Sequence, residues 1–376
     1  MMKKSICVIS LSNLARDGRV LRQIDYLSRE YDLTVIGYGP APEKYAGMPN
    51  LHWHEISLPK QAAVRTAYTI TARLLQIPFF PRTHPAYQFA LESRSDAYHA
   101  NNWDSLPIAA MAARKNGGKL VLDIHESYDS WYWGLSTGII KYVLKKYSPD
   151  VLASTTVVKQ LADQYRKFGL NPIVLMNAPA HPYIPIPPKK TDPLKIRLIH
   201  HGVASFARRT DLMIKTIAQC DVRYELHLVL TNLASTYVTS LRHLANQIAP
   251  GRVTFHPPFS PFEIVQEIAN YDIGFFPLPP TNYNYIITLP NKLFEFIVAG
   301  LAVCIGPSPA MAEIVNQYHC GLVAPSFEPS VLAGALNQTT AVEWDQMRQA
   351  SLCAARVLNA DIEMGKLVRI YHELLD

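Results

Sequence analysis

The segment PNKLFEFIVAG, Pro290 to Gly300, predicts a short buried helix that carries two charges. Pro290 suits the first turn of a helix, Gly300 suits the position just beyond its end, and most residues between them are apolar. Lys292 and Glu295 are three residues apart, so they share one face about one turn apart. Two interpretations are open: a solvated ion pair on an exposed edge, or two groups that serve a ligand.

The strands predicted on both sides of this helix decide the fold. YDIGFFPL (Tyr271 to Leu278) precedes the helix, and LAVCI (Leu301 to Ile305) follows it. A helix between two parallel strands has its N-terminus at the carboxyl edge of the sheet, where ligands bind. This position favours the ligand interpretation for Lys292 and Glu295.

Strand-like and helical patterns alternate along the rest of the chain. The alternation predicts an α/β protein with two Rossmann-like domains facing a cleft, each a parallel sheet with helices on both faces. The other strands are expected at 5–10, 32–37, 96–100, 119–124 and 151–154, and then at 196–202, 224–230 and 253–256.

A proline-rich stretch separates the two predicted domains. The stretch from Asn177 to Pro193 contains six prolines and can continue neither a helix nor a strand. We therefore expect an N-terminal domain over 1–176, a linker over 177–194 and a C-terminal domain over 195–358. A last helix is expected over 359–376, and packing back on the N-terminal domain is one arrangement open to it.

The composition is that of a globular protein. The 376 residues are 49% hydrophobic and 18% charged, which suits two cores of ordinary size. No window approaches eighteen uncharged apolar residues and the start lacks a signal-peptide pattern, so a cytoplasmic location is expected. The five cysteines show no CxxC spacing and are expected to be reduced thiols, with no metal site.

The positive charge belongs to the first half of the chain. Up to Pro188 there are 21 Lys and Arg against 14 Asp and Glu, whereas the rest has 15 against 16. Basic residues recur among apolar ones from Lys60 to Arg82, with Arg65 and Arg73 between, and again from Ile139 to Tyr147. Such segments can lie on an anionic membrane or be ordinary solvated helix faces. No nucleic-acid-binding motif accompanies the charge, so nucleic acid is not an expected partner.

A dinucleotide-binding oxidoreductase is disfavoured. Neither the strand at 5–10 nor the strand at 196–202 is followed by GxGxxG, the turn that brings a helix N-terminus to a pyrophosphate.

Several segments, in order and spacing, resemble the family-four glycosyltransferases of the GT-B fold. They are DGRVLRQIDYLSREYDLTVIG from Asp17, DAYHANNWDSLPIAAMAARKNGGKLVLDIHE from Asp96, IHHGVASFARRTDLMIKTI from Ile199, and YDIGFFPL with PNKLFEFIVAGLAV. The resemblance implies transfer of a sugar from a UDP- or GDP-linked donor to an acceptor glycan or lipid-linked glycan, as in polysaccharide biosynthesis. It also implies retention of configuration, no bound metal and no other cofactor, an acceptor site in the N-terminal domain and a donor site in the C-terminal domain.

The resemblance assigns donor-binding roles in the C-terminal domain. Glu295 matches the glutamate that binds the ribose hydroxyls, but Ile287 stands where the family has a first glutamate. Gly202 would let the chain pass close to the phosphates. Basic groups would pair with the diphosphate. The donor-binding residues expected are Gly202, Arg208, Arg209, Asn291, Lys292 and Glu295.

The resemblance also assigns residues to the N-terminal domain. His125 follows the strand at 119–124 and is the expected catalytic residue, in contact with the donor sugar or with the acceptor proton. The acceptor-side residues expected are Asp17, Gly18, Arg19, His99 and Asn101. For His99 and Asn101 a purely structural role is equally open.

Two alternatives to transfer remain. A nucleotide-sugar 2-epimerase shares the fold and needs no acceptor, and Ile287 suggests a catalytically degenerate protein that only binds the sugar nucleotide. No Asp-x-Asp occurs in the sequence, which favours a route without a divalent cation, in which cationic side chains stabilise the departing phosphate.

Overall fold

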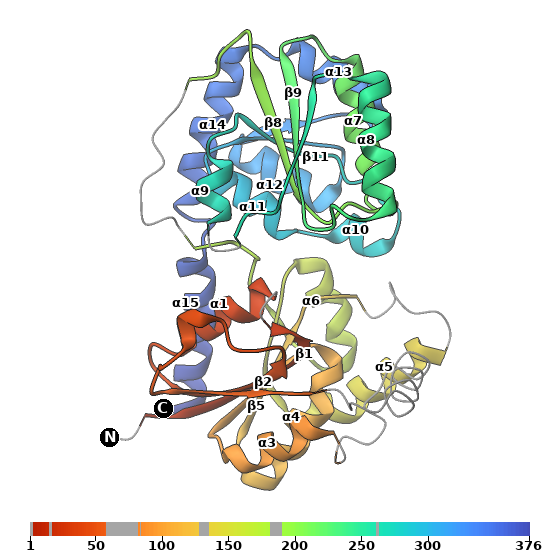
Figure 1. Cartoon of the computed structure of the whole chain (residues 1–376). Coiled ribbons are helices and arrows are strands. Elements are labelled where there is room, and N and C mark those ends of the chain that lie inside the picture. The colour runs from red at the N-terminus through yellow and green to blue at the C-terminus, as the bar shows by residue number, and fades with distance from the viewer. Residues whose placement is uncertain are drawn as a thin grey trace. The chain divides into compact units, whose positions relative to one another are not determined.

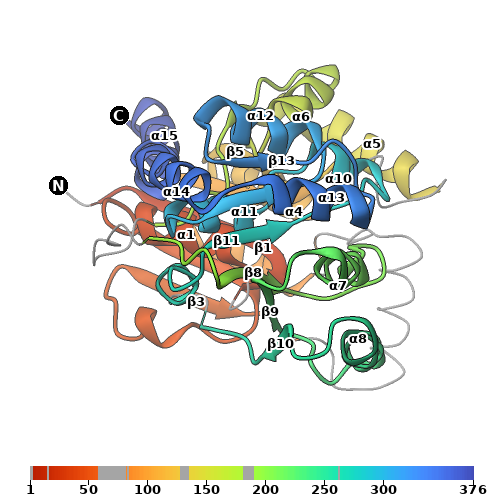
Figure 2. The same ribbon diagram turned by 90° about the horizontal axis from the view of Figure 1, so that it is seen from above.

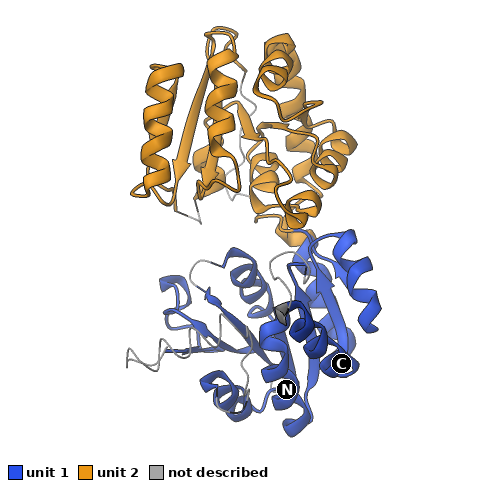
Figure 3. Cartoon of the chain, turned by 90° about the vertical axis from the view of Figure 1, so that its right-hand side faces the viewer, with its two compact units in different colours: residues 1–176, 363–376 blue, residues 177–362 orange. Residues whose placement is uncertain are grey.

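The computed structural model describes residues 3–14, 17–57, 82, 84–127, 135–180, 190–260 and 263–376. The basic segment from Lys60 to Arg82 lies outside these residues except for Arg82 itself. The chain forms two compact units, residues 1–176 with 363–376 and residues 177–362 (Figure 3).

The first unit is a seven-stranded sheet in the order β3-β2-β1-β4-β5-β6-β7, with every neighbouring pair parallel. Helices α3 and α4 lie on one side of this sheet and α1 and α15 on the other (Figure 1). The strands are β1 (Ser5–Asn13), β2 (Asp32–Tyr38), β3 (Leu51–Glu55), β4 (Ala97–Asn101), β5 (Lys119–Ile124), β6 (Val151–Thr156) and β7 (Ile173–Val174). The α-helices are α1 (Gly18–Leu27), α3 (Pro85–Ser93), α4 (Asn102–Asn116), α5 (Leu135–Tyr147), α6 (Lys159–Tyr165) and α15 (Ala360–Leu375).

The second unit repeats this design with six parallel strands in the order β10-β9-β8-β11-β12-β13. Figure 2 shows β10, β9, β8 and β11 following one another in this order. The strands are β8 (Ile196–Gly202), β9 (Tyr224–Leu230), β10 (Val253–His256), β11 (Ile273–Phe276), β12 (Ala302–Ile305) and β13 (Gly321–Val323). The α-helices are α7 (Thr210–Gln219), α8 (Thr236–Ile248), α9 (Ile264–Ile268), α10 (Tyr283–Ile287), α11 (Asn291–Val298), α12 (Pro309–Tyr318), α13 (Pro329–Gln338) and α14 (Ala341–Ala355).

The predicted fold class, two parallel-sheet Rossmann-like domains, is confirmed. All the strands expected from the sequence are present, with bounds that shift by a few residues at most. Three strands were not predicted: β3, because the polar side chains of LHWHE hide its pattern, and β7 and β13, because they are only two and three residues long. That the two domains face a cleft stays a prediction.

The charged helix predicted within Pro290 to Gly300 is α11 (Asn291–Val298). Pro290 is its N-cap, in extended conformation, rather than a first-turn residue, so that detail of the prediction was wrong. Gly300 follows the last turn with φ +67°, and its N–H donates to the Ile297 carbonyl while the N–H of Leu301 donates to Phe296. These two bonds close the helix in the way that a left-handed residue allows.

From Glu363 onward, the C-terminal helix α15 makes polar contacts with other parts of the first unit. The Tyr371 hydroxyl lies 2.7 Å from His99 Nδ1, and Glu363 accepts from the Met176 N–H at 2.9 Å. Near the end of the helix, His372 Nε2 lies 2.6 Å from Glu30. Among the described residues, no helix is both long enough and apolar enough to span a membrane.

Candidate functional site

The donor-side candidates of the second unit gather where its strand order reverses. Strands β8 and β11 are neighbours, and the chain runs from β8 to β9 on one side and from β11 to β12 on the other. In open α/β sheets, ligands bind outside the carboxyl ends of the strands at this switch point. Gly202 ends β8 here with φ +115°, a conformation that favours glycine.

Lys292 places a buried ammonium beside Gly202. A Cβ on Gly202 would lie 3.3 Å from Lys292 Nζ, so even a methyl group would press on the ammonium. The lysine is 7% exposed, and its Nζ lies 4.3 Å from the centre of the Phe276 ring. Among the described residues it has no carboxylate within ion-pair distance. Burial, reinforced by the charge of Arg208, lowers the pKa of Lys292 to about 7.

The structure separates the two neighbouring arginines. A guanidinium nitrogen of Arg208 would lie 3.9 Å from a Cβ on Gly202, so this side chain approaches the same point as Lys292. Arg209 instead forms two hydrogen bonds with Asp211, at 3.1 and 3.2 Å. Arg209 also has a left-handed backbone, with φ +51°, as the N-cap of α7. Of the predicted pair, only Arg208 therefore lies next to Lys292.

Glu295 lies one turn after Lys292 on α11. Its Oε2 is 3.2 Å from Nε2 of His201, the residue before Gly202, and the His201 ring packs edge-on against Phe296. Glu295 thus belongs to the same carboxyl-edge cluster, held in place by β8. Asn291 is the first residue of α11 and is partly exposed, while Ile287, at the end of α10, is buried.

His200 was not predicted as part of this site. It is fully buried, stacks on Phe276 and has Nδ1 3.2 Å from the Phe275 carbonyl. Burial, and then the charge of Lys292, hold its pKa well below the usual range, so it stays neutral beneath the lysine. His201 was also missed. The signal for it was the alternation of IHHG, which turns the two histidines to opposite faces of β8.

In the first unit, the predicted acceptor-side residues Asp17 and Gly18 are partly exposed, whereas Arg19 is buried. Asp17 is the N-cap of α1, where its carboxylate accepts from the Val20 N–H at 3.2 Å and from the Ser12 hydroxyl at 2.7 Å. Gly18 is the first residue of the helix. Arg19 is buried, and its guanidinium donates two hydrogen bonds of 2.7 Å to Asp123.

His125 lies just beyond the carboxyl end of β5. Its Nε2 is 2.7 Å from Asp123, and its backbone N–H donates to the Asn102 side chain at 3.1 Å. Two carboxyl groups share its surroundings: burial raises the pKa of Asp104 to about 6 and raises the pKa of Glu126. The structure thus brings His125 and Arg19 together through one carboxylate.

His99 and Asn101 lie on β4 and are both buried. His99 contacts Tyr371 of α15, and burial lowers its pKa to about 4. Asn101 is in register with Ser10 of β1 and Asp123 of β5, and neither atom of its amide has a hydrogen-bond partner among the described residues. The contact of His99 is that of a structural side chain. The acceptor-side roles of both residues stay predictions.

Comparison with solved structures supports the architecture, whereas the two sequence comparisons give no match. Neither protein-family models nor curated protein sequences give a match. Among solved structures, the chain is similar to Alr3699/HepE of Anabaena in complex with UDP and glucose, with a TM-score of 0.73, 13% identity and coverage of 98% of this chain and 100% of that one. The chain has the GT-B fold.

Two further GT-B structures extend the likeness over both units. A glycosyltransferase from Rickettsia africae has a TM-score of 0.70 at 13% identity and covers 100% of this chain and 99% of that one. The sucrose-phosphate synthase of Thermosynechococcus elongatus has a TM-score of 0.72 at 12% identity, with 99% of each chain covered.

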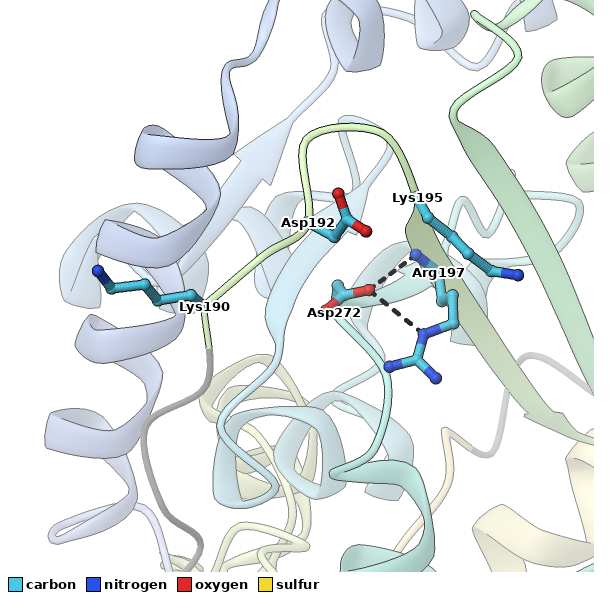
Figure 4. A pocket seen from close by; sticks show the side chains of 5 residues that line it. All are labelled: Lys190, Asp192, Lys195, Arg197 and Asp272. Carbon is cyan, nitrogen blue, oxygen red and sulfur yellow. Dashed lines mark hydrogen bonds and ion pairs between the residues drawn. The ribbon is translucent and has the colours of Figure 1, made fainter.

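A small cavity of the second GT-B domain lies at the opposite edge of its sheet, where β8 and β11 begin (Figure 4). It has a volume of about 140 Å³, and two of its charged lining residues, Arg197 and Asp272, form an ion pair. Asp272 accepts from the Arg197 N–H at 2.8 Å and lies 3.7 Å from the Arg197 guanidinium. Among the described residues, no group of three or more His, Cys, Asp or Glu could hold a metal ion.

Proposed function

We propose that the protein is a glycosyltransferase that moves a sugar from a nucleoside diphosphate donor to a glycan or lipid-linked glycan, with retention of configuration and without a metal. The observation that carries the proposal is the buried Lys292 ammonium, which lies beside Gly202 and Arg208 and has no carboxylate partner among the described residues. A buried charge without a partner is costly, and an anionic ligand at this point would compensate for it.

The proposed donor site uses each group in a distinct way. Lys292 and Arg208 pair with the diphosphate and stabilise the negative charge that grows on it as the glycosidic bond breaks. Gly202 allows the phosphates to come close to the backbone. Glu295 accepts hydrogen bonds from two neighbouring ribose hydroxyls, for which a carboxylate is a suitable acceptor pair.

UDP is the first nucleotide to test, because structures of HepE contain UDP and UDP-glucose. Incubation with labelled UDP-sugars and a mixture of glycan acceptors separates the readings of the site. A new glycoside supports transfer. A changed sugar on the donor would mean an epimerase, and binding without either product would mean a degenerate protein, the reading that the buried Ile287 motivates.

The two arginines are expected to behave differently. Arg208→Gln should weaken UDP binding by about 10-fold or more but leave uridine binding unchanged, because uridine lacks the phosphates. Arg209→Gln is the matched control, because it removes the same charge one residue away from a side chain that already pairs with Asp211. This variant should change UDP affinity by less than about threefold. Calorimetric titration of both variants measures the difference. Equal losses of UDP affinity in the two variants would contradict a specific role of Arg208 in phosphate binding.

Glu295→Gln is expected to weaken UDP binding with little effect on the thermal stability of the second unit. Loss of charge-assisted bonds to the ribose should cost about 1.5–3 kcal/mol of binding free energy. The 2′-deoxy analogue of UDP provides the control, since it lacks one of the hydroxyls and should lose less affinity in the variant than UDP does. Similar UDP affinity in the variant and the wild type would contradict the ribose assignment.

We also propose that the first unit attaches peripherally to anionic membranes at the inner face of the cytoplasmic membrane, through α5. Ile140, Val143 and Leu144 are buried, while the opposite face of the helix is exposed and basic. That exposed face consists of Lys141, Tyr142, Lys145 and Lys146. A basic face with an exposed tyrosine suits the interface of a membrane that contains anionic lipid.

Changing Lys141, Lys145 and Lys146 together to glutamine should reduce co-sedimentation with vesicles that contain phosphatidylserine. Each basic residue near such a surface contributes about 1 kcal/mol, so the partition coefficient should fall by about 100-fold at low salt. Added salt should reduce the binding of the wild type as well. A control with Lys190, Lys195 and Lys215 changed to glutamine has the same net charge. If the wild type stays in the supernatant at low salt, a soluble acceptor becomes the better proposal.

A further inference from the structure

The Asp123 carboxylate of β5 is saturated with hydrogen-bond donors. It is fully buried, and Oδ2 accepts from Arg19 Nε at 2.7 Å and Gln23 Nε2 at 2.6 Å, both on α1. Oδ1 accepts from Arg19 Nη2 at 2.7 Å and from the Thr155 hydroxyl of β6 at 2.6 Å. His125 Nε2, 2.7 Å from Oδ2, is the fifth contact.

This environment keeps Asp123 ionised. An arginine side chain only donates hydrogen bonds, so it cannot accept one from a protonated carboxyl group. Burial by itself acts to raise the pKa of Asp123, but the Arg19 guanidinium and His125 outweigh it and hold the pKa well below the ordinary range. An ionised carboxylate can only accept. The ring nitrogen of His125 that faces it must therefore carry a proton.

We propose that Asp123 is a positioning residue that fixes His125 in the tautomer with a proton on Nε2. Nδ1 is then the nitrogen that contacts the substrate. The inference rests on the proposed glycosyl transfer for the identity of that substrate. The neutral ring then presents the lone pair of Nδ1, which accepts a hydrogen bond from a sugar hydroxyl or takes its proton. The opposite tautomer would present a donor instead.

Further contacts support this assignment. The backbone N–H of His125 donates to the Asn102 side chain at 3.1 Å. The main chain of His125 is therefore held by Asn102 and its ring by Asp123. The His125 side chain is 18% exposed, unlike Asp123, so a ligand can reach it. Among the described residues, Nδ1 has no hydrogen-bond partner that would use its lone pair. The other charged groups that act on the same cluster are Asp17, Arg19, Asp104 and Glu126.

The tautomer can be read from the wild-type protein without any assay of activity. In protein labelled with ¹⁵N-histidine at about pH 9, where an ordinary imidazole is neutral, the two nitrogens of one ring differ strongly in chemical shift. His125→Gln identifies the signals by their loss. We expect the pyrrole-type shift on Nε2 and the pyridine-type shift on Nδ1. The reverse pattern, or a proton on both nitrogens at this pH, would overturn the proposal.

Two variants test the role of Asp123. Asp123→Asn should reverse the tautomer and lower kcat by on the order of 100-fold or more, with a smaller change in KM. Thr155→Val is the matched control, because it removes a donor from the other carboxylate oxygen and should leave the tautomer and kcat unchanged. A reversed tautomer with unchanged kcat would contradict the positioning role. If Asp123→Asn does not fold, the wild-type spectrum still decides the tautomer.

The outcomes also separate this inference from the proposed function. UDP binds to the second unit in that proposal, so UDP affinity should be the same in the wild type and in Asp123→Asn. A protein that shows the expected tautomer but binds no UDP would keep the Asp123 assignment and refute the donor site. A protein that binds UDP and transfers sugar, but whose His125 has the opposite tautomer, would keep the donor site and refute the Asp123 assignment.

Discussion

Replacing Lys292 by methionine is expected to weaken UDP binding by about 10- to 150-fold near pH 7, which corresponds to the loss of one charged hydrogen bond to phosphate, about 1.5–3 kcal/mol. Methionine keeps much of the volume of the lysine stem, so the packing against Phe276 should survive. Lys215→Met provides the control. It removes the same charge from α7 of the same unit, where Lys215 pairs with Asp211, and should leave UDP affinity unchanged.

The affinity of the wild type for UDP should also fall as the pH rises above about 7. Without ligand, burial and Arg208 lower the pKa of Lys292 to about 7, and a bound diphosphate would raise it again. Binding then takes up a proton between the two pKa values, so affinity falls by up to about tenfold per pH unit in that window. The terminal phosphate of UDP is fully ionised there, and His200 stays neutral.

Two variants check the origin of this pH dependence. Lys292→Arg keeps its charge at every accessible pH and should bind UDP with a flat profile from about pH 7 to pH 9. Lys292→Met should be flat and weak. Because the folded-state pKa of Lys292 lies below that of the unfolded chain, the wild type should gain stability as the pH rises through this range, and Lys292→Met should be at least as stable near pH 7. A flat wild-type profile would refute the role of the lysine.

Arg19→Met is expected to destabilise the first unit by about 3–5 kcal/mol, because it leaves the buried Asp123 carboxylate without its cationic partner. The other donors to Asp123 are neutral or partly exposed and cannot replace the guanidinium. Urea unfolding followed by tryptophan fluorescence measures the loss, since four of the five tryptophans precede residue 177. The second unit should unfold as in the wild type, which makes it an internal reference.

Low pH and a second substitution provide the controls for Arg19. The stability contributed by the depressed pKa of Asp123 is present above the pKa of the unfolded carboxyl and is lost as the pH falls through the folded value, so the deficit of Arg19→Met should shrink in acid. The double variant Arg19→Met with Asp123→Leu should recover much of the loss, because both charges are then absent. A loss below about 1 kcal/mol would mean that the ion pair contributes little.

The sequence predicted the sheets well because their signals are local. Buried parallel strands are rich in apolar runs, and the strands that were expected from the sequence, such as SICVIS and LAVCI, could be found in this way. The donor-side cluster was also within reach, since Lys292 and Glu295 share one helix and Gly202 ends a predicted strand. The sequence did not reveal β3, because polar residues interrupt its apolar pattern: LHWHE forms this strand although only Leu51 is buried.

The contacts that organise the first unit could not be predicted. Arg19 and Asp123 are 104 residues apart, and nothing in either local pattern indicates that the two side chains meet. His99 and Tyr371 are separated by 272 residues and meet only because the last helix returns to the first unit. In the second unit, the separation of Arg208 from Arg209 depends on the left-handed backbone of Arg209, which a sequence of two adjacent arginines does not reveal.

The central claim is that the carboxyl edge of the second unit holds a nucleoside diphosphate, and a crystal structure of the protein with UDP tests it most directly. We expect phosphate oxygens within hydrogen-bond distance of Lys292 Nζ and of the Arg208 guanidinium, with the ribose hydroxyls at Glu295. A diphosphate bound elsewhere on the protein, or one bound here without contact to Lys292, would contradict it.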